Sequence, residues 1–348
     1  MSNDILTIGK YEIKRGTSNT IELDLPNLYN TPTKLPIKVL RGKKDGPTVF
    51  VSATIHGDEL NGIEIIRRFK KLSILKRLKG TIILVPVINV YGILTLSRYF
   101  PDRRDLNRCF PGSTRGSLAS RVAKIFFDEI VSKCDFGIDL HTAAIHRSNF
   151  PQIRTNLNNK VTLKMAKVFE APIILHSELL QGSLRALCDE KGIPIILYEA
   201  GEALRFDEKS IRIGVNGIVN VLREYNMLPK VFKKSKRIPL ITSNSQWIRA
   251  VESGVIRTIK ALGDTVQEDE VIAYIDEAHS DTTFELKSPF DGVIIGKSEI
   301  PLAQEGDAIF HIAKFNDLEN AEGKIGYFHE DVIEQSEFDE LQDEKTIE

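Results

Sequence analysis

Residues 48–59, TVFVSATIHGDE, decide how this chain is expected to fold. The first seven are strand formers, and apolar residues at helical spacing follow from Leu60 to Phe69. His56 and Glu59 therefore fall at a predicted strand-to-helix turn, which Gly57 permits. An imidazole and a carboxylate at such a turn can converge on one metal ion. His-x-x-Glu also occurs by chance, and Asp58 is predicted only to cap the helix, so partners elsewhere must decide.

Composition narrows the class of protein. The chain has 348 residues, of which 42% are apolar and 27% charged, enough to bury the cores of two domains. A net charge of -1 without a basic cluster argues against nucleic acid as a partner. The N-terminus lacks a basic segment followed by an apolar core, and no apolar run is long enough for a bilayer. We therefore expect a cytoplasmic protein without a membrane partner.

Strands alternate with helices over the first two thirds of the chain. Predicted strands cover residues 48–54, 81–87, 136–140, 172–175 and 193–198, and predicted helices cover 115–134, 159–169, 183–191 and 208–225. Such alternation predicts an α/β fold, a mixed and mostly parallel sheet with helices on both faces. Sites in such sheets form at the carboxyl ends of strands, where His56 is expected.

The texture of the sequence changes near Pro229. We predict a catalytic domain over residues 1–229, with an N-terminal β segment over 1–44, then a basic linker over 230–244. Short β segments separated by Gly and Pro predict a small all-β module over 245–314. The acidic residues 315–348 are expected to form a frayed tail.

Two further strand ends complete the candidate site. The strand over 136–140 leads into His141, the natural third metal ligand, and only His and carboxylate ligands are available because the three cysteines show no Cys-x-x-Cys pairing. Asp139 either orients a ligand ring or bonds to backbone. Glu199 follows the apolar strand 193–198, where partial desolvation suits a general base and acid. His56, Glu59 and His141 leave tetrahedral zinc one open position for a water.

A loop rich in arginine lies between the first and third ligands. Arg98, Arg103, Arg104 and Arg108 fall within eleven residues that Pro and Gly punctuate. A planar guanidinium suits bidentate capture of a carboxylate. The arginines of this loop therefore either bind the substrate or are merely exposed to solvent at the surface.

Four motifs together resemble the succinylglutamate desuccinylase/aspartoacylase family, a branch of the zinc carboxypeptidase fold. They are HGDE at 56–59, RDLNR at 104–108, DLHT at 139–142 and YEAG at 198–201, in the family's order and rough spacing. The resemblance implies that His56, Glu59 and His141 hold one Zn²⁺ ion per chain. It also implies that Glu199 is the catalytic carboxylate.

The resemblance assigns roles to further polar residues. Asn107 and Arg108 are expected to grip the α-carboxylate of the substrate. An arginine is expected to polarise the scissile carbonyl; Arg98 matches it, with Arg104 as a rival. Arg154 is expected to line the substrate pocket.

The substrate is less well specified by the resemblance. In aspartoacylase an arginine shortly before the catalytic glutamate holds the second carboxylate of acetylaspartate. Here the closest upstream basic residues are Lys191 and Arg185, in a different register. Acetylaspartate is therefore not assured.

The β module resembles a biotinyl/lipoyl carrier sandwich without the lysine to which the cofactor is attached. No Lys or Arg occurs between Ala261 and Leu286, and His279 lies roughly where the carrier lysine would stand. We expect the module to shield the active-site mouth or to make subunit contacts, which leaves a homo-oligomer open.

The sequence thus predicts a zinc-dependent amidohydrolase acting on a small-molecule partner, an N-acyl amino acid or similar small amide. A zinc carboxypeptidase acting on short peptides is the alternative. A non-catalytic binding protein that has kept the fold is the third possibility.

Overall fold

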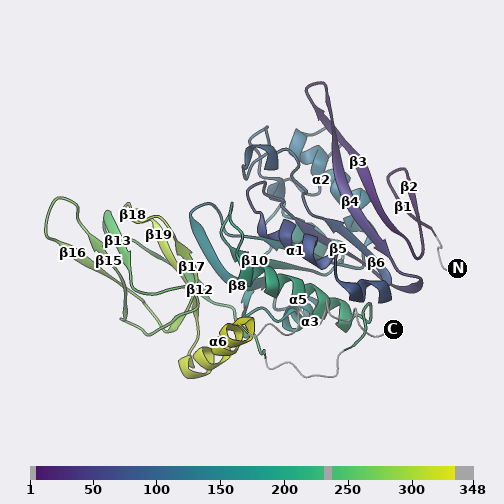
Figure 1. The fold of residues 1–348 in the computed structure, drawn as a ribbon. Helices are drawn as coiled ribbons and strands as arrows, with labels where there is room; N and C mark the ends of the chain where they lie inside the picture. Colours follow the sequence, from purple (N-terminus) through teal and green to yellow (C-terminus); the bar gives the residue numbers. More distant parts are fainter. Residues whose placement is uncertain (1–4, 231–236, 334–348) are drawn as a thin grey trace.

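The computed structural model describes residues 5–230 and 237–333 (Figure 1). Within these residues, thirteen strands join one continuous sheet. Its main path runs, from one edge to the other, through β12 (Ser245–Arg249), β19 (Ala308–Lys314), β17 (Gly292–Ser298), β8 (Arg147–Thr155), β10 (Ile195–Gly201), β7 (Phe136–His141), β5 (Lys44–Ala53), β6 (Lys79–Val85), β4 (Thr31–Arg41) and β3 (Ser18–Leu28). Off this path, β9 (Ile173–His176) pairs with β8, β11 (Leu240–Thr242) with β9, and β14 (Thr265–Val266) with β17.

The centre of the sheet is parallel. Strands β10, β7, β5 and β6 all run in one direction, whereas β8, β4 and β3 are antiparallel to their neighbours on this path. The carboxyl ends of β5, β7 and β10 therefore meet at one edge. The predicted metal ligands and Glu199 all belong to these three strand ends.

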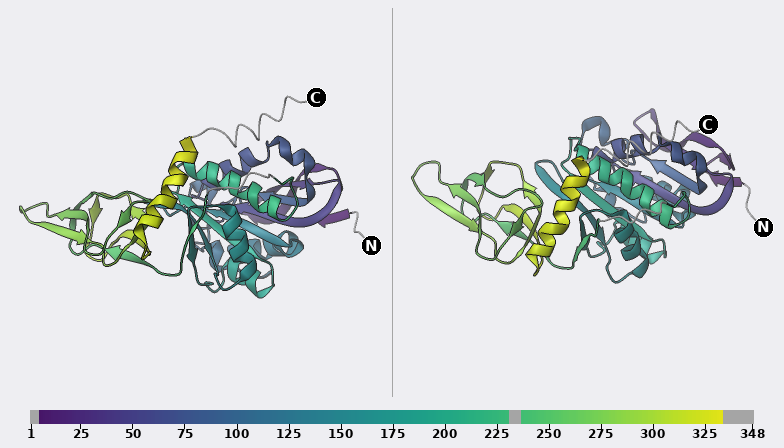
Figure 2. Two further views of the ribbon diagram at one scale, coloured as in Figure 1. Left: turned by 90° about the horizontal axis from the view of Figure 1, so that it is seen from below. Right: turned by 60° about the horizontal axis from the view of Figure 1, so that its bottom comes forward.

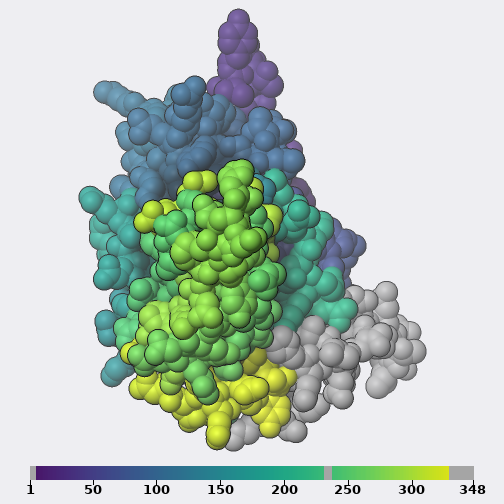
Figure 3. Space-filling model, turned by 90° about the vertical axis from the view of Figure 1, so that its left-hand side faces the viewer, coloured from purple at the N-terminus to yellow at the C-terminus, as the bar shows by residue number. Residues whose placement is uncertain are grey.

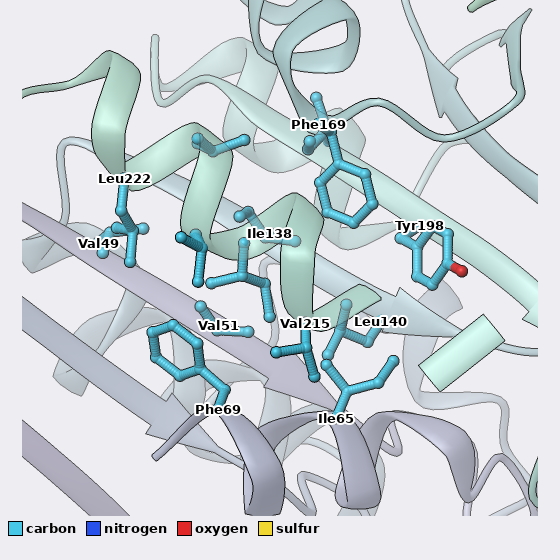
Figure 4. Packing of buried hydrophobic residues seen from close by; sticks show 14 of the residues in the cluster. Val49, Val51, Ile65, Phe69, Ile138, Leu140, Phe169, Tyr198, Val215 and Leu222 are labelled. Atoms are coloured by element: carbon cyan, nitrogen blue, oxygen red, sulfur yellow. The ribbon is translucent and has the colours of Figure 1, made fainter. Parts of the chain in front are cut away.

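Helices cover both faces of the sheet, as expected. Their bounds are α1 (Asn61–Phe69), α2 (Leu118–Glu129), α3 (Lys160–Phe169), α4 (Leu184–Glu190) and α5 (Glu208–Glu224), with short 3₁₀ turns η1 (Ser73–Arg77), η2 (Ile93–Thr95), η3 (Leu106–Arg108) and η4 (Val131–Lys133). Helices α1, α3 and α5 share one hydrophobic core with the sheet, and α2 and α4 share the other. Figure 4 shows the first core, where Val51 and Ile138 of neighbouring strands lie among the side chains of Phe69 and Val215. Helices on opposite faces thus fix the sheet between two apolar layers.

Side chains begin four of these helices in the way their sequences suggest. Ser117, Asn159, Ser183 and Asp207 each accept a backbone N–H from the first turn of the helix that follows. Such caps satisfy donors that would otherwise lack partners. The predicted bounds of α3, α4 and α5 agree with the observed ones to within one residue, whereas the predicted range 115–134 extends beyond α2 at both ends and includes η4.

The N-terminal segment extends the sheet and adds a ribbon. Strands β1 (Ile5–Ile8) and β2 (Tyr11–Lys14) form a separate antiparallel pair. The long hairpin of β3 and β4 projects beyond the body, and it forms the purple protrusion at the top of Figure 3. Tyr29 at its turn is 94% exposed. No helix in the described part of the chain is long and apolar enough to cross a bilayer.

The C-terminal β module is joined to the main sheet by hydrogen bonds. A second, four-stranded sheet contains β13 (Gly254–Thr258), β15 (Val271–Asp276), β16 (Thr283–Lys287) and β18 (Leu302–Ala303). It packs against β12, β17 and β19 around a separate apolar core. Because β17 pairs antiparallel with the start of β8, the sheet passes without a break from one part of the protein to the other. The module thus forms an arm continuous with the α/β part of the protein (Figure 2).

Two segments differ from their sequence-based descriptions. The predicted linker contains β11, which joins the catalytic sheet through β9; residues 231–236 lie outside the described part. The start of the predicted frayed tail is a helix, α6 (Leu318–Ile333). Its residues Ala321 and Ile325 are buried in an apolar cluster with Phe150 and Val293 at the junction of the two parts. Helical spacing of these apolar residues outweighs the acidic composition, and residues 334–348 lie outside the described part.

Candidate active site

Three buried side chains converge beside the carboxyl ends of β5 and β7. Nδ1 of His56 lies 2.6 Å from Oε1 of Glu59, and Nδ1 of His141 lies 2.9 Å from Oε2 of the same carboxylate. One potential ligand atom from each residue lies within 4.8 Å of the others. Two imidazoles and one carboxylate in this arrangement form a donor set for a divalent cation.

A second carboxylate contacts the far nitrogen of each histidine. Nε2 of His141 lies 2.9 Å from Oδ2 of Asp139, and Nε2 of His56 lies 3.2 Å from Oδ1 of Asp105. Asp139 in turn accepts a hydrogen bond from Ser52 at 2.7 Å. Carboxylates placed in this way fix the orientation of ligand rings and leave Nδ1 facing the metal position.

The charges of the cluster fit a cation. Burial opposes ionisation of Glu59, but His56 and His141 outweigh it and hold the pKa of this carboxyl well below its usual range. Burial likewise opposes a charge on His141, yet Asp139 and Glu59 raise its pKa well above the ordinary value. The carboxylates of Glu59, Asp105 and Asp139 thus favour positive charge at the two imidazoles, and Arg98 contacts two of these three carboxylates. A bound dication would supply that positive charge in place of the imidazole protons.

The turn itself differs in two details from its prediction. A Cβ at Gly57 would lie 2.2 Å from the carbonyl carbon of Gly92, so glycine is needed for the close approach of that loop. The prediction that Asp58 caps the following helix is wrong. Helix α1 begins one residue after Leu60 and has no side-chain cap, whereas Asp58 is buried and burial raises the pKa of its carboxyl.

Glu199 comes to the same pocket from β10. Its strand pairs with β7 so that Glu199 and His141 are direct neighbours across the ladder. The Glu199 side chain is mostly buried, and its Oε2 lies 2.6 Å from Nε of Arg154 on β8. Arg154, expected only to line the pocket, both lines it and forms an ion pair with Glu199.

The two candidate arginines of the loop lie in different places. Nη2 of Arg98 is 2.9 Å from Oδ2 of Asp105, and its Nη1 is 3.5 Å from Oε1 of Glu59. Arg104 is exposed and is not among the described residues that line the pocket. The structure therefore brings Arg98, and not Arg104, beside the candidate metal ligands.

Asn107 and Arg108 line the same pocket. Oδ1 of Asn107 accepts the backbone N–H of Leu184 at 2.9 Å, and Nη1 of Arg108 donates to the carbonyl of Asn107 at 2.7 Å. The first bond ties turn η3 to the start of α4. This contact holds the two polar side chains at the edge of the pocket.

The pocket that contains these residues has a volume of about 310 Å³. Five arginines and two carboxylates line it; the arginines are Arg98, Arg108, Arg147, Arg154 and Arg185. Of the two upstream basic residues, Arg185 is buried and donates to Ser177 and Glu178, whereas Lys191 pairs with Glu190 at the surface. The excess of guanidinium groups suits a ligand that carries negative charge.

Three residues at the site escaped the sequence-based reasoning. Asp105 was part of a recognised motif but had no assigned role, and its contact with His56 spans 49 positions. Arg147 and Trp247 also line the pocket, Trp247 from strand β12 of the module. A lone tryptophan beyond the catalytic domain gave no local signal of its position.

Known proteins resemble this chain in sequence and in fold. N-α-acetyl-L-2,4-diaminobutyric acid deacetylase from Halomonas elongata is 26% identical over 293 residues, which cover 80% of this chain and 85% of that protein. A succinylglutamate desuccinylase/aspartoacylase structure from Rhodobacter sphaeroides has a TM-score of 0.76 at 24% identity and covers 86% of this chain and 96% of that one. The product-bound ectoine utilization protein EutE (DoeB) from Ruegeria pomeroyi has a TM-score of 0.77 at 22% identity, covering 90% of this chain and 100% of that one.

The family assignment comes from the catalytic domain. Residues 45–225, more than half of the chain, match the succinylglutamate desuccinylase/aspartoacylase catalytic domain. This segment holds the three candidate metal ligands and the neighbouring Glu199. The chain belongs to the succinylglutamate desuccinylase/aspartoacylase family.

Proposed function

We propose that this protein is a zinc-dependent amidohydrolase that removes the acyl group from an N-acyl amino acid or a similar small amide. The observation that carries the proposal is the meeting of His56, Glu59 and His141 in one pocket with the carboxylate of Glu199. The relative from Halomonas elongata is a deacetylase by name, which supports an amide as the substrate class.

His56, Glu59 and His141 would hold the zinc ion. Zinc bound there would act as a Lewis acid: it would polarise the scissile carbonyl and lower the pKa of the attacking water. Glu199 then takes a proton from the attacking water and delivers it to the leaving nitrogen, which makes the amine a better leaving group. Because Glu199 neighbours His141 across the ladder, its carboxylate is close to the reacting atoms.

Arg98 and the pair Asn107 and Arg108 act on different parts of the substrate. The Arg98 guanidinium lies 3.5 Å from a ligand oxygen of Glu59, where it can share the negative charge that develops on the carbonyl oxygen. Asn107 and Arg108 bind the α-carboxylate through hydrogen bonds and charge. Substrate carboxylate and carbonyl would thus be held at two points, which fixes the amide relative to Glu199.

A turnover screen tests this function. Zinc-loaded protein is incubated with N-acetyl, N-succinyl and N-formyl amino acids, with dipeptides as the alternative substrates, and the released amine is quantified. We expect cleavage of at least one N-acyl amino acid in preference to the dipeptides. Glu199→Gln should lower turnover by about 10²–10⁴-fold while zinc stays bound.

Three results would count against the proposal. Cleavage of dipeptides alone would favour the carboxypeptidase. No cleavage by the zinc-loaded protein would favour a non-catalytic binding protein. An unchanged rate in the Glu199→Gln protein would remove Glu199 from its role.

A further inference from the structure

The β module contributes the single tryptophan of this chain to the active-site pocket. Trp247 lies on β12, an edge strand of the continuous sheet, and lines the same pocket as the metal ligands and Glu199. The next residue on the strand, Ile248, is buried in the core of the module. Because side chains alternate along a strand, Trp247 points to the opposite face, out of that core and toward the catalytic domain.

A row of cross-strand neighbours links Trp247 to the strand that carries Glu199. Residues paired across neighbouring strands point to the same face of a sheet. The pairs are Trp247 with His311, His311 with Gly296, Gly296 with Asn149, and Asn149 with Gly201. Gly201 is the last residue of β10, two positions after Glu199. The row therefore crosses the junction of module and catalytic domain (Figure 1).

Glycine in the middle of this row leaves space for the indole. A Cβ at Gly296 would lie 3.0 Å from Oδ1 of Asn149 and 3.5 Å from Cη2 of Trp247. Any larger side chain would therefore push the indole or the amide aside. Because Gly296 has no side chain, the indole of Trp247 can occupy the space beside it.

Two contacts hold the indole in one position. The His311 ring stacks on it with centroids 4.8 Å apart and planes 10° from parallel, and Cζ of Arg147 lies 5.0 Å from the indole ring. Nε2 of His311 lies 2.9 Å from Oγ of Ser245, which fixes the imidazole in turn. Burial, followed by the nearby Arg154, lowers the pKa of His311 to about 3, so this ring is neutral at physiological pH. A ring with both contacts is a rigid wall.

Trp247 also lines a second hollow. A surface groove of about 720 Å³ runs between β12 and β16, and Trp247 is part of its lining together with Arg249, Leu286 and Pro289. The same residue thus lines the 310 Å³ pocket and the outer groove. Figure 3 shows the module, in green, standing in front of the catalytic domain on this side.

The direction of a bound substrate is inferred from the elements that carry the residues of the pocket. The loop with Asn107 and Arg108 contacts His56 through Asp105 and the start of α4 through Asn107. Trp247 belongs to β12, which β19, β17 and β8 separate from β10. A substrate whose α-carboxylate is held by Asn107 and Arg108, with its amide at the metal ligands, points its acyl group toward Trp247.

We propose that Trp247, fixed between Arg147 and His311, determines the acyl specificity of the enzyme by ending the acyl side of the pocket. This inference rests on the proposed amidohydrolase function. Short acyl groups such as formyl and acetyl fit in front of the indole, whereas an aromatic acyl group or the N-terminal part of a peptide collides with it. Trp247 would therefore favour cleavage of short N-acyl amino acids over cleavage of peptides.

Substitution of the wall tests the proposal. The acetyl, hexanoyl and benzoyl derivatives of the amino acid best cleaved in the screen are compared for kcat/KM. Trp247→Ala should raise the benzoyl-to-acetyl ratio by at least about tenfold, since one or a few misplaced carbons change specificity on that scale. Trp247→Phe should give a ratio between those of wild type and Trp247→Ala. Gln246→Ala, which changes a neighbour on the other face of β12, should keep the wild-type ratio.

Fluorescence of the sole tryptophan gives a second measurement that needs no turnover. Zinc-loaded Glu199→Gln protein is titrated with the acetyl derivative, and binding is followed in parallel by calorimetry. We expect a saturable change of tryptophan emission with the calorimetric Kd. Calorimetric binding without any change of emission would overturn the role of Trp247.

The two possible failures can be told apart. If wild-type protein cleaves the acetyl derivative and Trp247→Ala folds, binds zinc and keeps the wild-type ratio, the wall is contradicted and the amidohydrolase stands. If Trp247→Ala does not fold, the benzoyl-to-acetyl ratio of Trp247→Phe and the emission change in the titration test the role of Trp247 instead. If wild-type protein cleaves no N-acyl amino acid, the proposed function fails, and the inference fails with it.

Discussion

Nε of Arg154 lies 2.6 Å from Oε2 of Glu199, and the two side chains form an ion pair in the wall of the pocket. They come from neighbouring antiparallel strands. Glu199 pairs with Gln152 across the ladder, so Arg154 is its diagonal neighbour two residues further along β8. The contact gives Arg154 a place beside the proposed proton carrier in addition to its place in the pocket lining.

Replacement of Arg154 by Met should therefore lower kcat more than it raises KM. Without its partner the Glu199 carboxylate is free to turn away from the reacting atoms, and a misplacement of that size costs about a hundredfold. Arg154→Lys should recover part of the loss. Steady-state kinetics on the best N-acyl amino acid provide the test; a raised KM with unchanged kcat would instead identify Arg154 as a binder of substrate.

Arg98 and Arg104 form a matched pair of variants from one loop. Arg98→Ala should lower kcat by about 10²–10³-fold, because its guanidinium beside Glu59 is the proposed partner of the developing oxyanion. Arg104→Ala should leave kcat near the wild-type value because this side chain is exposed outside the pocket. Equal losses in both variants, measured with zinc content held equal, would contradict the assignment.

Asp139 and Asp105 should control the affinity for zinc. Each contacts Nε2 of a proposed ligand histidine, and loss of such a partner typically weakens metal binding by about 10–100-fold. We expect Asp139→Asn and Asp105→Asn to show this loss in competition with a fluorescent chelator. Asp102→Asn, in the same loop as Asp105, is the control. Wild-type affinity in both test variants would show that the carboxylates do not orient the rings.

Glu64 on α1 should make stability depend on pH. Hydrogen bonds from Arg67 and Arg68, opposed by burial, lower the pKa of Glu64 from its ordinary value of 4.5 to about 2. A carboxyl with a lowered pKa stabilises the fold fully above its unfolded-state pKa and loses that contribution as pH falls toward the folded-state value. Glu64→Gln should therefore cost roughly 1 kcal/mol of unfolding free energy at pH 7.

The difference between wild type and Glu64→Gln should shrink as pH falls from about 5 toward 2. Calorimetric unfolding of both proteins at several pH values provides the measurement. Glu285→Gln, which removes an exposed partner of Lys287, is the control and should change little at any pH. A pH-independent difference at Glu64 would attribute its cost to packing.

The sequence was informative about the strands of the candidate site because their signals are local. His141 ends a strand, Glu59 ends the turn that begins at His56, and Glu199 is the fifth residue of a β-rich run. Parallel strands bring such ends to one edge, so their convergence could be predicted without knowing the strand order. Helix positions followed in the same way from apolar residues at helical spacing.

Strand β8, the continuous sheet and the place of Trp247 could not be predicted, because they depend on contacts between segments far apart in the sequence. Strand β8 contains Pro151 and was not predicted, yet it carries Arg154 and pairs with β17 of the module. Pairing between strand edges leaves no periodic pattern in either strand, so the continuous sheet could not be foreseen. The place of Trp247 in the pocket follows only from that sheet. The helix α6 was missed for another reason: Ala321, Ile325 and Phe328 do stand at helical spacing, but the acidic composition of the segment favoured a frayed tail.

The metal content of purified and zinc-loaded variants tests the central claim most directly. Wild-type protein and Glu199→Gln should each hold about one zinc ion per chain, measured by plasma mass spectrometry after dialysis, because Glu199 is not a ligand. His141→Ala should lose most of the zinc while near-ultraviolet circular dichroism shows a folded protein. Zinc-free wild-type protein, or full zinc in the His141→Ala variant, would contradict the account.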